Sequence, residues 1–290
     1  MSHSPRLLVT GASGALGRLV VEALLERVEP SRVVAAVRDP AKLADLAARG
    51  VEVRAADYEQ PDTLAAAFAG IDRLLLISSN AVGQRRPQHA NAIAAAKDAA
   101  VGLIAYTSIL HADRSPLGLA VEHVQTEALL AESGVPFALL RNSWYLENYF
   151  GVIAPALEHG LVFGSAGEGR IAAASRADYA AAAAAVLTAT EDQGGKIYEL
   201  AGDDAFTMAE WAATLAEVGG KPVAYRDLPQ ADYAALLVQH GLPEGFAGLL
   251  ADSDVGASKG GLFDDGGALA RLIGRPTTTL KAALAAALKG

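Results

Sequence analysis

The chain of 290 residues has a formal net charge of −9, and 52% of its residues are hydrophobic and 20% charged, a mixture typical of a globular protein with a large core. The negative charge disfavours nucleic acid as a partner, and no apolar stretch is long enough to span a bilayer. Because there is no cysteine, disulfides, thiolate nucleophiles and cysteine-ligated metals are excluded. The first residues show no signal or lipidation pattern, so we expect a soluble, cytoplasmic protein.

The first half of the chain alternates short apolar runs with amphipathic segments. Six runs rich in Val, Leu and Ile predict strands over residues 6–10, 32–37, 51–55, 73–77, 103–107 and 136–141. Five Ala- and Leu-rich segments between them predict helices over residues 16–28, 41–49, 63–68, 88–100 and 120–133. Strands so continuously apolar are typical of a parallel sheet buried on both faces. The pattern predicts an α/β fold with a Rossmann-like, doubly wound parallel sheet.

The alternation stops after the sixth predicted strand, and the remaining pattern is mostly helical. Its predicted elements are a helix over 144–159, a turn or hairpin over 160–169, a strand over 196–200 and helices from residue 229 onward. Ser175 and Thr207 begin capping-box patterns, in which a hydroxyl and a later carboxylate satisfy free N–H groups, so each predicts a helix start.

This change of pattern predicts two domains. We expect a NAD(P)-binding Rossmann domain over residues 1–142, with later return segments near 171–200. A smaller, mostly helical substrate-binding lobe is expected over residues 143–290. The strand predicted over 196–200 either returns to the sheet or belongs to the lobe.

A glycine-rich turn connects the first predicted strand to the first predicted helix. It reads Gly11-Ala12-Ser13-Gly14-Ala15-Leu16-Gly17. Glycines permit a tight turn and a close approach of the backbone to a pyrophosphate, and the helix N-terminus directs N–H groups at the anion. Three glycines alone are a weak signal, but between a first strand and a first helix they predict a dinucleotide-binding turn. A purely structural turn is the alternative.

The end of the second predicted strand indicates which dinucleotide is bound. NAD-specific proteins place an acid there for the ribose hydroxyls, whereas this chain has Arg38, which can bind a 2′-phosphate and stack on adenine. Arg18 and Lys42 are candidate helpers, while Asp39 could still bind a ribose. We predict NADPH as the cofactor, with NADH as the alternative. Ordinary solvated charges are the other interpretation of Arg38 and Lys42.

Two further segments follow strands at the same edge of the predicted sheet, where ligands bind such folds. Asp57 and Tyr58 follow the third strand, and we expect them beside the adenine or simply in a loop leading to a helix. Ser78, Ser79 and Asn80 follow the fourth strand, and we expect them to pass the cofactor ribose mainly with backbone contacts.

Several motifs together resemble the NmrA-like atypical short-chain dehydrogenase/reductases. They are the glycine-rich turn and the segments 37–42, 56–58, 122–127, 140–148, 175–178 and 272–276. Within that group the chain most resembles the bacterial type 2 NAD(P)H quinone oxidoreductases and the triphenylmethane reductases. The resemblance spans essentially the whole chain and implies a fold and a nicotinamide cofactor more firmly than a substrate.

The expected chemistry does not use the tyrosine and lysine of ordinary short-chain dehydrogenases, because the corresponding helix has His123 and Glu127. A quinone accepts hydride without tightly coupled protonation, so solvent can supply the proton. We therefore predict direct hydride transfer from NADPH to a quinone or related aromatic acceptor, without flavin.

Four side chains are candidates for catalytic contacts. Ser108 would donate a hydrogen bond to a substrate oxygen, Asn142 and Tyr145 would orient a carbonyl oxygen, and His123 would assist proton delivery. The alternatives are second-lobe packing for Asn142 and Tyr145, and a surface or capping role for His123. The six histidines lack metal-ligand spacing, so no metal is expected.

The leading hypothesis is therefore an NADPH-dependent quinone reductase that acts on a small aromatic substrate. The alternative is a non-catalytic NmrA-like redox sensor that binds NADP(H) and acts through a protein partner. A sugar-nucleotide epimerase is disfavoured because the tyrosine proton relay is absent. A homodimer is the default expectation for the assembly.

Overall fold

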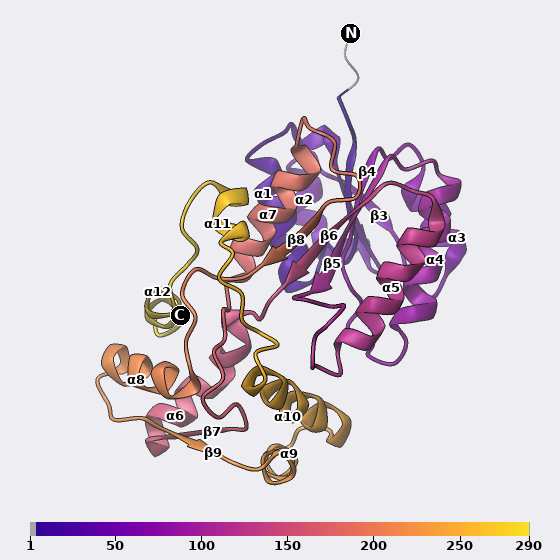
Figure 1. Ribbon diagram of the computed structural model, residues 1–290. Coiled ribbons are helices and arrows are strands. Elements are labelled where there is room, and N and C mark those ends of the chain that lie inside the picture. Colours follow the sequence, from indigo (N-terminus) through magenta and orange to yellow (C-terminus); the bar gives the residue numbers. More distant parts are fainter. Residues whose placement is uncertain (1–3, 290) are drawn as a thin grey trace. The chain divides into compact units, whose positions relative to one another are not determined.

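The structure is a computed structural model that describes residues 4–289. Its centre is a seven-stranded sheet with the order β3-β2-β1-β4-β5-β6-β8 (Figure 1). The pairs that join β1, β2, β3, β4 and β5 are all parallel. From β1 the chain builds the sheet first toward β3 and then, from β4, in the other direction, which is the doubly wound arrangement. The predicted fold class is confirmed.

The six predicted strands and five predicted helices of the first half are all present. The strands are β1 Leu7–Val9, β2 Val33–Val37, β3 Glu52–Ala55, β4 Arg73–Leu76, β5 Leu103–Ile109 and β6 Phe137–Asn142. The helices are α1 Ala15–Leu25, α2 Ala44–Ala48, α3 Pro61–Phe68, α4 Arg85–Asp98 and α5 Ala120–Ser133, with short 3-10 helices η1 Pro30–Arg32 and η2 Pro40–Leu43. The helix predicted over 41–49 is divided between η2 and α2, because Asp39 and Pro40 start a separate turn.

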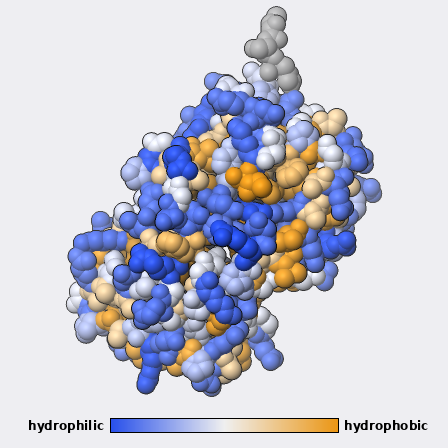
Figure 2. All heavy atoms as spheres, in the orientation of Figure 1, coloured by the Kyte–Doolittle hydropathy of each residue, from blue (hydrophilic) through white to orange (hydrophobic). Residues whose placement is uncertain are grey.

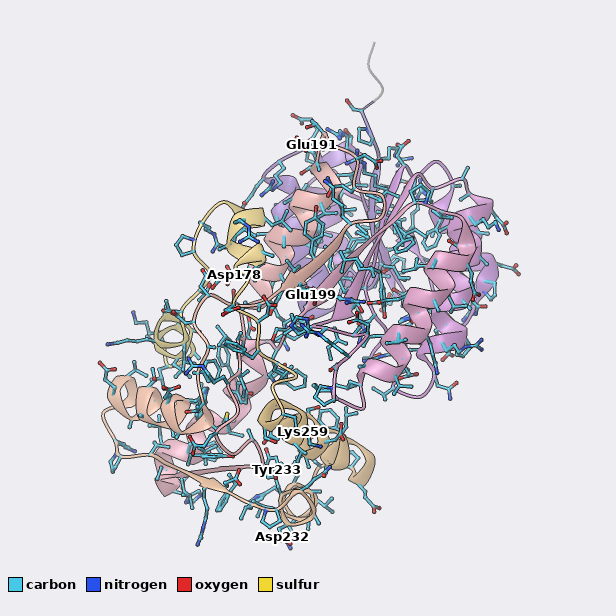
Figure 3. All side chains as sticks on the ribbon, viewed as in Figure 1. Asp178, Glu191, Glu199, Asp232, Tyr233 and Lys259 are labelled. Atoms are coloured by element: carbon cyan, nitrogen blue, oxygen red, sulfur yellow. The ribbon has the colours of Figure 1, made fainter. Side chains whose placement is uncertain are left out.

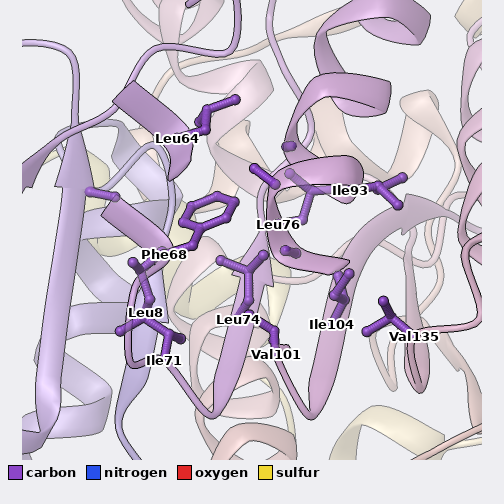
Figure 4. Close-up of a cluster of buried hydrophobic side chains, with 14 of the residues drawn as sticks. Leu8, Leu64, Phe68, Ile71, Leu74, Leu76, Ile93, Val101, Ile104 and Val135 are labelled. Carbon is purple, nitrogen blue, oxygen red and sulfur yellow. The ribbon is translucent and has the colours of Figure 1, made fainter. Parts of the chain in front are cut away.

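The core lies on both faces of the sheet. Helices α3, α4 and α5 cover one face, while α1 and α7 Arg176–Thr188 cover the other (Figure 1). Figure 4 shows one buried cluster, in which Leu8 and Leu74 of the sheet pack against Leu64 and Phe68 of α3. Each large apolar side chain that is fully buried contributes about 1.5–3 kcal/mol. The continuous apolar strands of the sequence therefore correspond to strands buried on both faces.

The chain forms two compact units. The described part of the first unit comprises residues 4–109, 122–141 and 176–198, and that of the second comprises 110–121, 142–175 and 199–289. Helix α7 thus packs within the first unit, against α1. Strand β8 Ile197–Leu200 is the edge strand of the seven-stranded sheet. The predicted strand over 196–200 therefore returns to the sheet, whereas the domain division at residue 142 stays a prediction.

The second unit is mostly helical, with a small sheet. Its elements are η3 Leu146–Val152, α6 Ile153–His159, β7 Leu161–Gly164, α8 Met208–Gly219, β9 Ala224–Asp227, α9 Gln230–Gln239, α10 Glu244–Ser258, α11 Ala268–Ile273 and α12 Leu280–Ala287. The capping box at Thr207 is confirmed at the start of α8, and α7 begins directly after Ser175. The helix predicted over 144–159 begins as a 3-10 helix only at Leu146.

The hairpin alternative for residues 160–169 is wrong, whereas a turn is present at the end of this stretch. Residues 161–164 form β7, which pairs in parallel with β9, and parallel strands require a long crossover instead of a hairpin. The turn follows, where Gly169 N donates to the carbonyl oxygen of Ala166 at 2.8 Å.

The half-buried Asp254 of α10 accepts a hydrogen bond from Ser165 N at 2.8 Å, just after β7. Desolvation raises the pKa of Asp254 to about 6. Tyr233 on α9, labelled in Figure 3, has a pKa that is raised by desolvation and by the charge of Asp254.

Polar side chains cover most of the face in Figure 2, with apolar residues in scattered patches. Within residues 4–289, no helix combines the length and the apolar character needed to cross a membrane. In the same range, no group of three or more His, Asp or Glu side chains is arranged to hold a metal ion.

Candidate cofactor and active site

A cleft of about 430 Å³ lies in the first unit where β1, β2, β3 and β4 end. Its lining includes ten of the residues that the sequence predicts to bind cofactor: Gly11, Ser13, Gly14, Ala15, Arg38, Asp57, Tyr58, Ser78, Ser79 and Asn80. Three other predicted residues, Leu16, Gly17 and Lys42, do not line it. Four separate loops therefore contribute to one concave site, as expected at the carboxyl edge of a doubly wound sheet.

The glycine-rich turn has the backbone geometry of an anion site. Gly11 has a φ of +59°, which favours glycine, and a Cβ at Gly17 would lie 2.3 Å from the carbonyl oxygen of Gly11. Gly17 therefore allows the close packing of α1 on the turn. Helix α1 begins after Gly14 with no side-chain cap and no acidic residue in its first turn. Its first N–H groups, which lack intrahelical acceptors, are free to bind a phosphate.

Arg38 provides a free positive charge at the rim of this cleft. Its side chain is exposed and makes no hydrogen bond or ion pair with any other residue in the described part of the chain. The neighbouring Asp39 accepts a hydrogen bond from Ala41 N at 3.1 Å and so caps η2. Arg18, a candidate helper, forms an ion pair with Asp45. Asp39 and Arg18 thus have partners within the fold, whereas Arg38 is available for a ligand.

Asp57 and Tyr58 line the cleft but also stabilise the loop that holds them. The Asp57 carboxylate accepts a hydrogen bond from Glu59 N at 3.0 Å. The Tyr58 hydroxyl lies 2.6 Å from Thr10 Oγ1 and 2.7 Å from the carbonyl oxygen of Ile77. Burial raises the pKa of Tyr58, so its hydroxyl remains protonated and connects the ends of three strands. The two residues lie in the loop that leads to α3 and line the cleft, while their expected place beside the adenine stays a prediction.

Ser108 donates its hydrogen to a protein group, whereas the sequence-based hypothesis had it donate to a substrate oxygen. Its hydroxyl donates to Glu127 Oε1 at 2.6 Å, and Arg141 donates to both oxygens of the same carboxylate at 3.0 and 2.7 Å. Because Ser108 has one hydrogen and Glu127 takes it, only the lone pairs of Oγ remain for a ligand. The expected donation to a substrate oxygen is not supported. The buried Glu127 and Arg141 were not assigned these roles from the sequence.

His123 is buried, so the surface interpretation is wrong. One ring nitrogen, Nδ1, lies 2.8 Å from the Tyr106 hydroxyl, and Nε2 lies 3.3 Å from Arg85 Nη1. Burial, together with the nearby positive charge of Arg85, lowers the pKa of His123 to about 3. The ring is therefore neutral at physiological pH, which argues against the predicted part in proton delivery.

Asn142 and Tyr145 belong to the second unit. Asn142 is buried, and its Oδ1 atom has no hydrogen-bond partner among residues 4–289. Tyr145 is half-buried and forms an isolated parallel bridge with Ala174. A buried amide oxygen without a donor is uncommon in folded proteins. The substrate contacts proposed for both residues stay predictions.

The chain belongs to the NAD(P)H-binding family, whose model matches residues 11–190. This match covers the turn, the cleft and the sheet described above. The resemblance to the NmrA-like short-chain dehydrogenase/reductases, inferred from the sequence motifs, is confirmed by relatives that span nearly the whole chain.

Three comparisons describe these relatives. The chain is 57% identical to quinone oxidoreductase 2 of Escherichia coli over 274 residues, which are 94% of this chain and 96% of the relative. The crystal structure of the NADPH-dependent quinone oxidoreductase from E. coli complexed with NADPH matches with a TM-score of 0.95 and 56% identity, covering 97% and 99% of the two chains. The Citrobacter sp. triphenylmethane reductase complexed with NADP(H) matches with a TM-score of 0.93 and 38% identity, at the same coverage.

Proposed function

We propose that this protein is an NADPH-dependent reductase that transfers hydride directly to a quinone or a related aromatic acceptor, without flavin. The observation that carries the proposal is the cleft, in which an uncapped helix N-terminus and an unpaired Arg38 lie on neighbouring strand ends. The similarity to a quinone oxidoreductase and a triphenylmethane reductase supports the acceptor class.

The turn residues Gly11, Ser13, Gly14 and Ala15 would hold the pyrophosphate, because the α1 N-terminus lacks any competing side-chain anion. Arg38 would bind the 2′-phosphate, which distinguishes NADPH from NADH. Ser78, Ser79 and Asn80 would lie along the ribose. When bound, NADPH supplies the hydride, and with one proton from solvent the quinone becomes a hydroquinone.

The buried polar groups of the first unit favour this use of solvent. Ser108 donates its hydrogen to Glu127, and Arg141 holds that carboxylate in a bidentate ion pair. His123 is neutral, because its pKa is lowered to about 3. Neither the Ser108 hydroxyl nor the neutral His123 ring is a ready acid near pH 7. Ser108 could instead accept a hydrogen bond from the hydroquinone product, while Asn142 and Tyr145 remain our candidates for orienting the carbonyl.

The test is the loss of NADPH absorbance when flavin-free protein is mixed with a simple benzoquinone. A matched NADH reaction and a reaction without protein serve as controls. We expect protein-dependent turnover that is faster with NADPH at subsaturating cofactor. Tight binding of NADPH and NADP⁺ without turnover of any quinone or triphenylmethane dye would instead favour the redox sensor, which the similarity to named oxidoreductases disfavours.

Two finer expectations complete the proposal. We expect the protein to act in the cytoplasm, since a cysteine-free chain is compatible with a reducing compartment, and to form a homodimer, the commonest symmetric assembly. Cell fractionation tests the first expectation. Light scattering during size-exclusion chromatography tests the second, and a monomer at micromolar concentration would contradict it.

A further inference from the structure

A network of buried hydrogen bonds lies behind the loop that follows β4. Both backbone polar groups of Ser79 are satisfied by side chains of α4: Ser79 N donates to His89 Nε2 at 3.0 Å, and Arg85 Nε donates to the Ser79 carbonyl oxygen at 2.7 Å. His89 is 0% exposed, and Arg85 and Ser79 are each 9% exposed. Since Ser79 also lines the cleft, its backbone lies between the cleft and a buried polar network.

The network continues through α5 and β5 in two branches. In one, His89 Nδ1 lies 2.8 Å from Thr126 Oγ1. In the other, Arg85 Nη1 lies 3.3 Å from His123 Nε2, and His123 Nδ1 lies 2.8 Å from the Tyr106 hydroxyl. Both branches start from side chains that hold the Ser79 backbone.

The donors and acceptors allow one consistent placement of hydrogens. Arg85 can only donate, so His123 Nε2 accepts and its Nδ1 donates to the Tyr106 hydroxyl. Ser79 N–H requires an acceptor at His89 Nε2, so His89 Nδ1 donates to Thr126. The Thr126 hydroxyl donates onward to the carbonyl oxygen of Glu122 at 2.9 Å. Both ring nitrogens of His89 and of His123 thus have partners, and such a buried network is rigid.

Protonation does not disturb this arrangement near neutral pH. Burial, strengthened by the charge of Arg85, lowers the pKa of both His89 and His123 to about 3. The Glu122 carboxylate accepts hydrogen bonds from Gly83 N and Arg85 N, each at 3.0 Å, and so fixes the start of α4. The loop is thereby held at Ser79 and again at the first turn of the following helix.

We propose that His89 is a positioning residue for NADPH: held by Thr126, it fixes the Ser79 backbone so that residues 78–81 present a preformed edge of the cleft to the cofactor. Removing the acceptor would leave the Ser79 N–H buried without a partner, which favours other loop conformations. If the competent conformation falls to about one tenth of the population, the apparent Kd for NADPH rises about tenfold. The maximal rate at saturating NADPH would change little, because bound cofactor restores the loop.

The test measures NADPH binding by fluorescence titration of His89→Phe and His89→Gln. Phenylalanine keeps the ring shape without an acceptor, whereas the glutamine carbonyl can still accept from Ser79 N. We expect the Kd to rise about tenfold for His89→Phe and less for His89→Gln, with kcat at saturation within about twofold of the parent protein. Thr126→Val, which removes the partner of His89 Nδ1 but leaves the Ser79 bond, is a second variant, with an expected smaller rise in Kd.

The matched control is Arg73→Met at the opposite end of β4. Arg73 donates to the carbonyl oxygens of Leu187 and Ala189 at 2.9 and 2.7 Å, so its loss weakens the same unit away from the cleft. An unchanged Kd for NADPH in His89→Phe would overturn the proposal. So would an Arg73→Met variant that loses as much Tm as His89→Phe and shows an equal rise in Kd.

The inference rests on NADPH as the cofactor of the proposed reductase. Because binding is measured without quinone, failure of the quinone chemistry would be seen separately.

Discussion

The polar groups that line the cleft differ from the polar groups buried behind it. At the cleft, Arg38 has no partner within the described residues and the α1 N-terminus has no side-chain cap. In the interior of the same unit, the Ser79 backbone is held by His89 and Arg85, and Glu127 is paired with Arg141. Unpaired groups at the surface are available for a ligand, whereas paired groups in the interior fix the backbone. Changes in the two regions should therefore affect different measurements.

Arg141→Met should have the largest effect, and that effect should be on stability. It leaves the Glu127 carboxylate without its bidentate partner, and the two side chains are only 7% and 12% exposed. Loss of one member of a buried pair costs about 3–5 kcal/mol. Urea unfolding checks this value. A loss below about 1 kcal/mol would show that solvent reaches the pair, and Arg27→Met in the exposed turn after α1 is the matched control.

Gly17→Ala should affect both stability and binding. The added Cβ would lie 2.3 Å from the Gly11 carbonyl oxygen and 2.9 Å from Ala12 Cα, so the turn must shift. Overpacking of this kind typically costs about 1–3 kcal/mol, and the displaced turn should bind NADPH poorly. Gly248→Ala in α10, where a Cβ meets nothing within 4 Å, is the control. Unfolding curves and NADPH titrations that match the parent protein would contradict the close packing of α1 on the turn.

Arg38→Asp should change cofactor choice with little change in stability. A hydrogen bond to a charged group contributes about 1.5–3 kcal/mol, so we expect NADPH binding to weaken about 10- to 150-fold, with NADH affected much less. Titration with both cofactors measures the ratio, and Arg27→Asp controls for the change in net charge. Equal losses for the two cofactors would refute the 2′-phosphate assignment.

The pH dependence of stability should be small near neutral pH and should grow below about pH 6.5. His89 and His123 have folded pKa values of about 3, below the ordinary 6.5, so the unfolded chain binds more protons between these values. Stability is therefore lost as pH falls from about 6.5 toward 3. Asp254, with a raised pKa of about 6, acts in the opposite direction between about 4 and 6. Each histidine contributes a slope of up to about 1.4 kcal/mol per pH unit.

His123→Phe should remove one histidine's share of this slope. Unfolding free energies at pH 4.5, 5.5 and 6.5 in the variant and the parent protein measure the difference. His240→Phe, which changes an exposed histidine after α9, should leave the slope unchanged. Identical slopes in His123→Phe and the parent protein would mean that His123 titrates normally in the folded state.

The features that could be predicted from the sequence are those that depend on short-range patterns of residues. The apolar period located the strands and helices of the first half, and the position of Gly11 to Gly17 between a strand and a helix identified the turn. Arg38 was found because its place after the second strand is fixed by the fold class. The positions of these features are set by neighbours a few residues away in the chain, or by the order of strands that the fold class fixes.

What sequence reasoning missed depends on partners distant in the chain. Ser108 meets a carboxylate 19 residues later, and His89 meets Thr126 37 residues later, so their hydrogen-bonding roles have no local pattern. His123 beside Glu122 suggested a surface pair. In the structure, however, His123 contacts the Tyr106 hydroxyl, and Glu122 accepts a hydrogen bond from Arg85 N at the start of α4. Strand β7 was not predicted within the Gly-rich segment after α6, because the partner of β7, β9, lies about 60 residues further on.

The most direct test of direct hydride transfer is an anaerobic single-turnover measurement on flavin-free protein. The protein is loaded with NADPH or with NADPH carrying deuterium at both C4 positions, and then mixed with a saturating benzoquinone while the nicotinamide absorbance is followed. A single loss of absorbance that is slower with deuterium would agree with hydride transfer from the bound cofactor to the quinone. No protein-dependent loss, or a loss that requires added flavin, would contradict the proposed function.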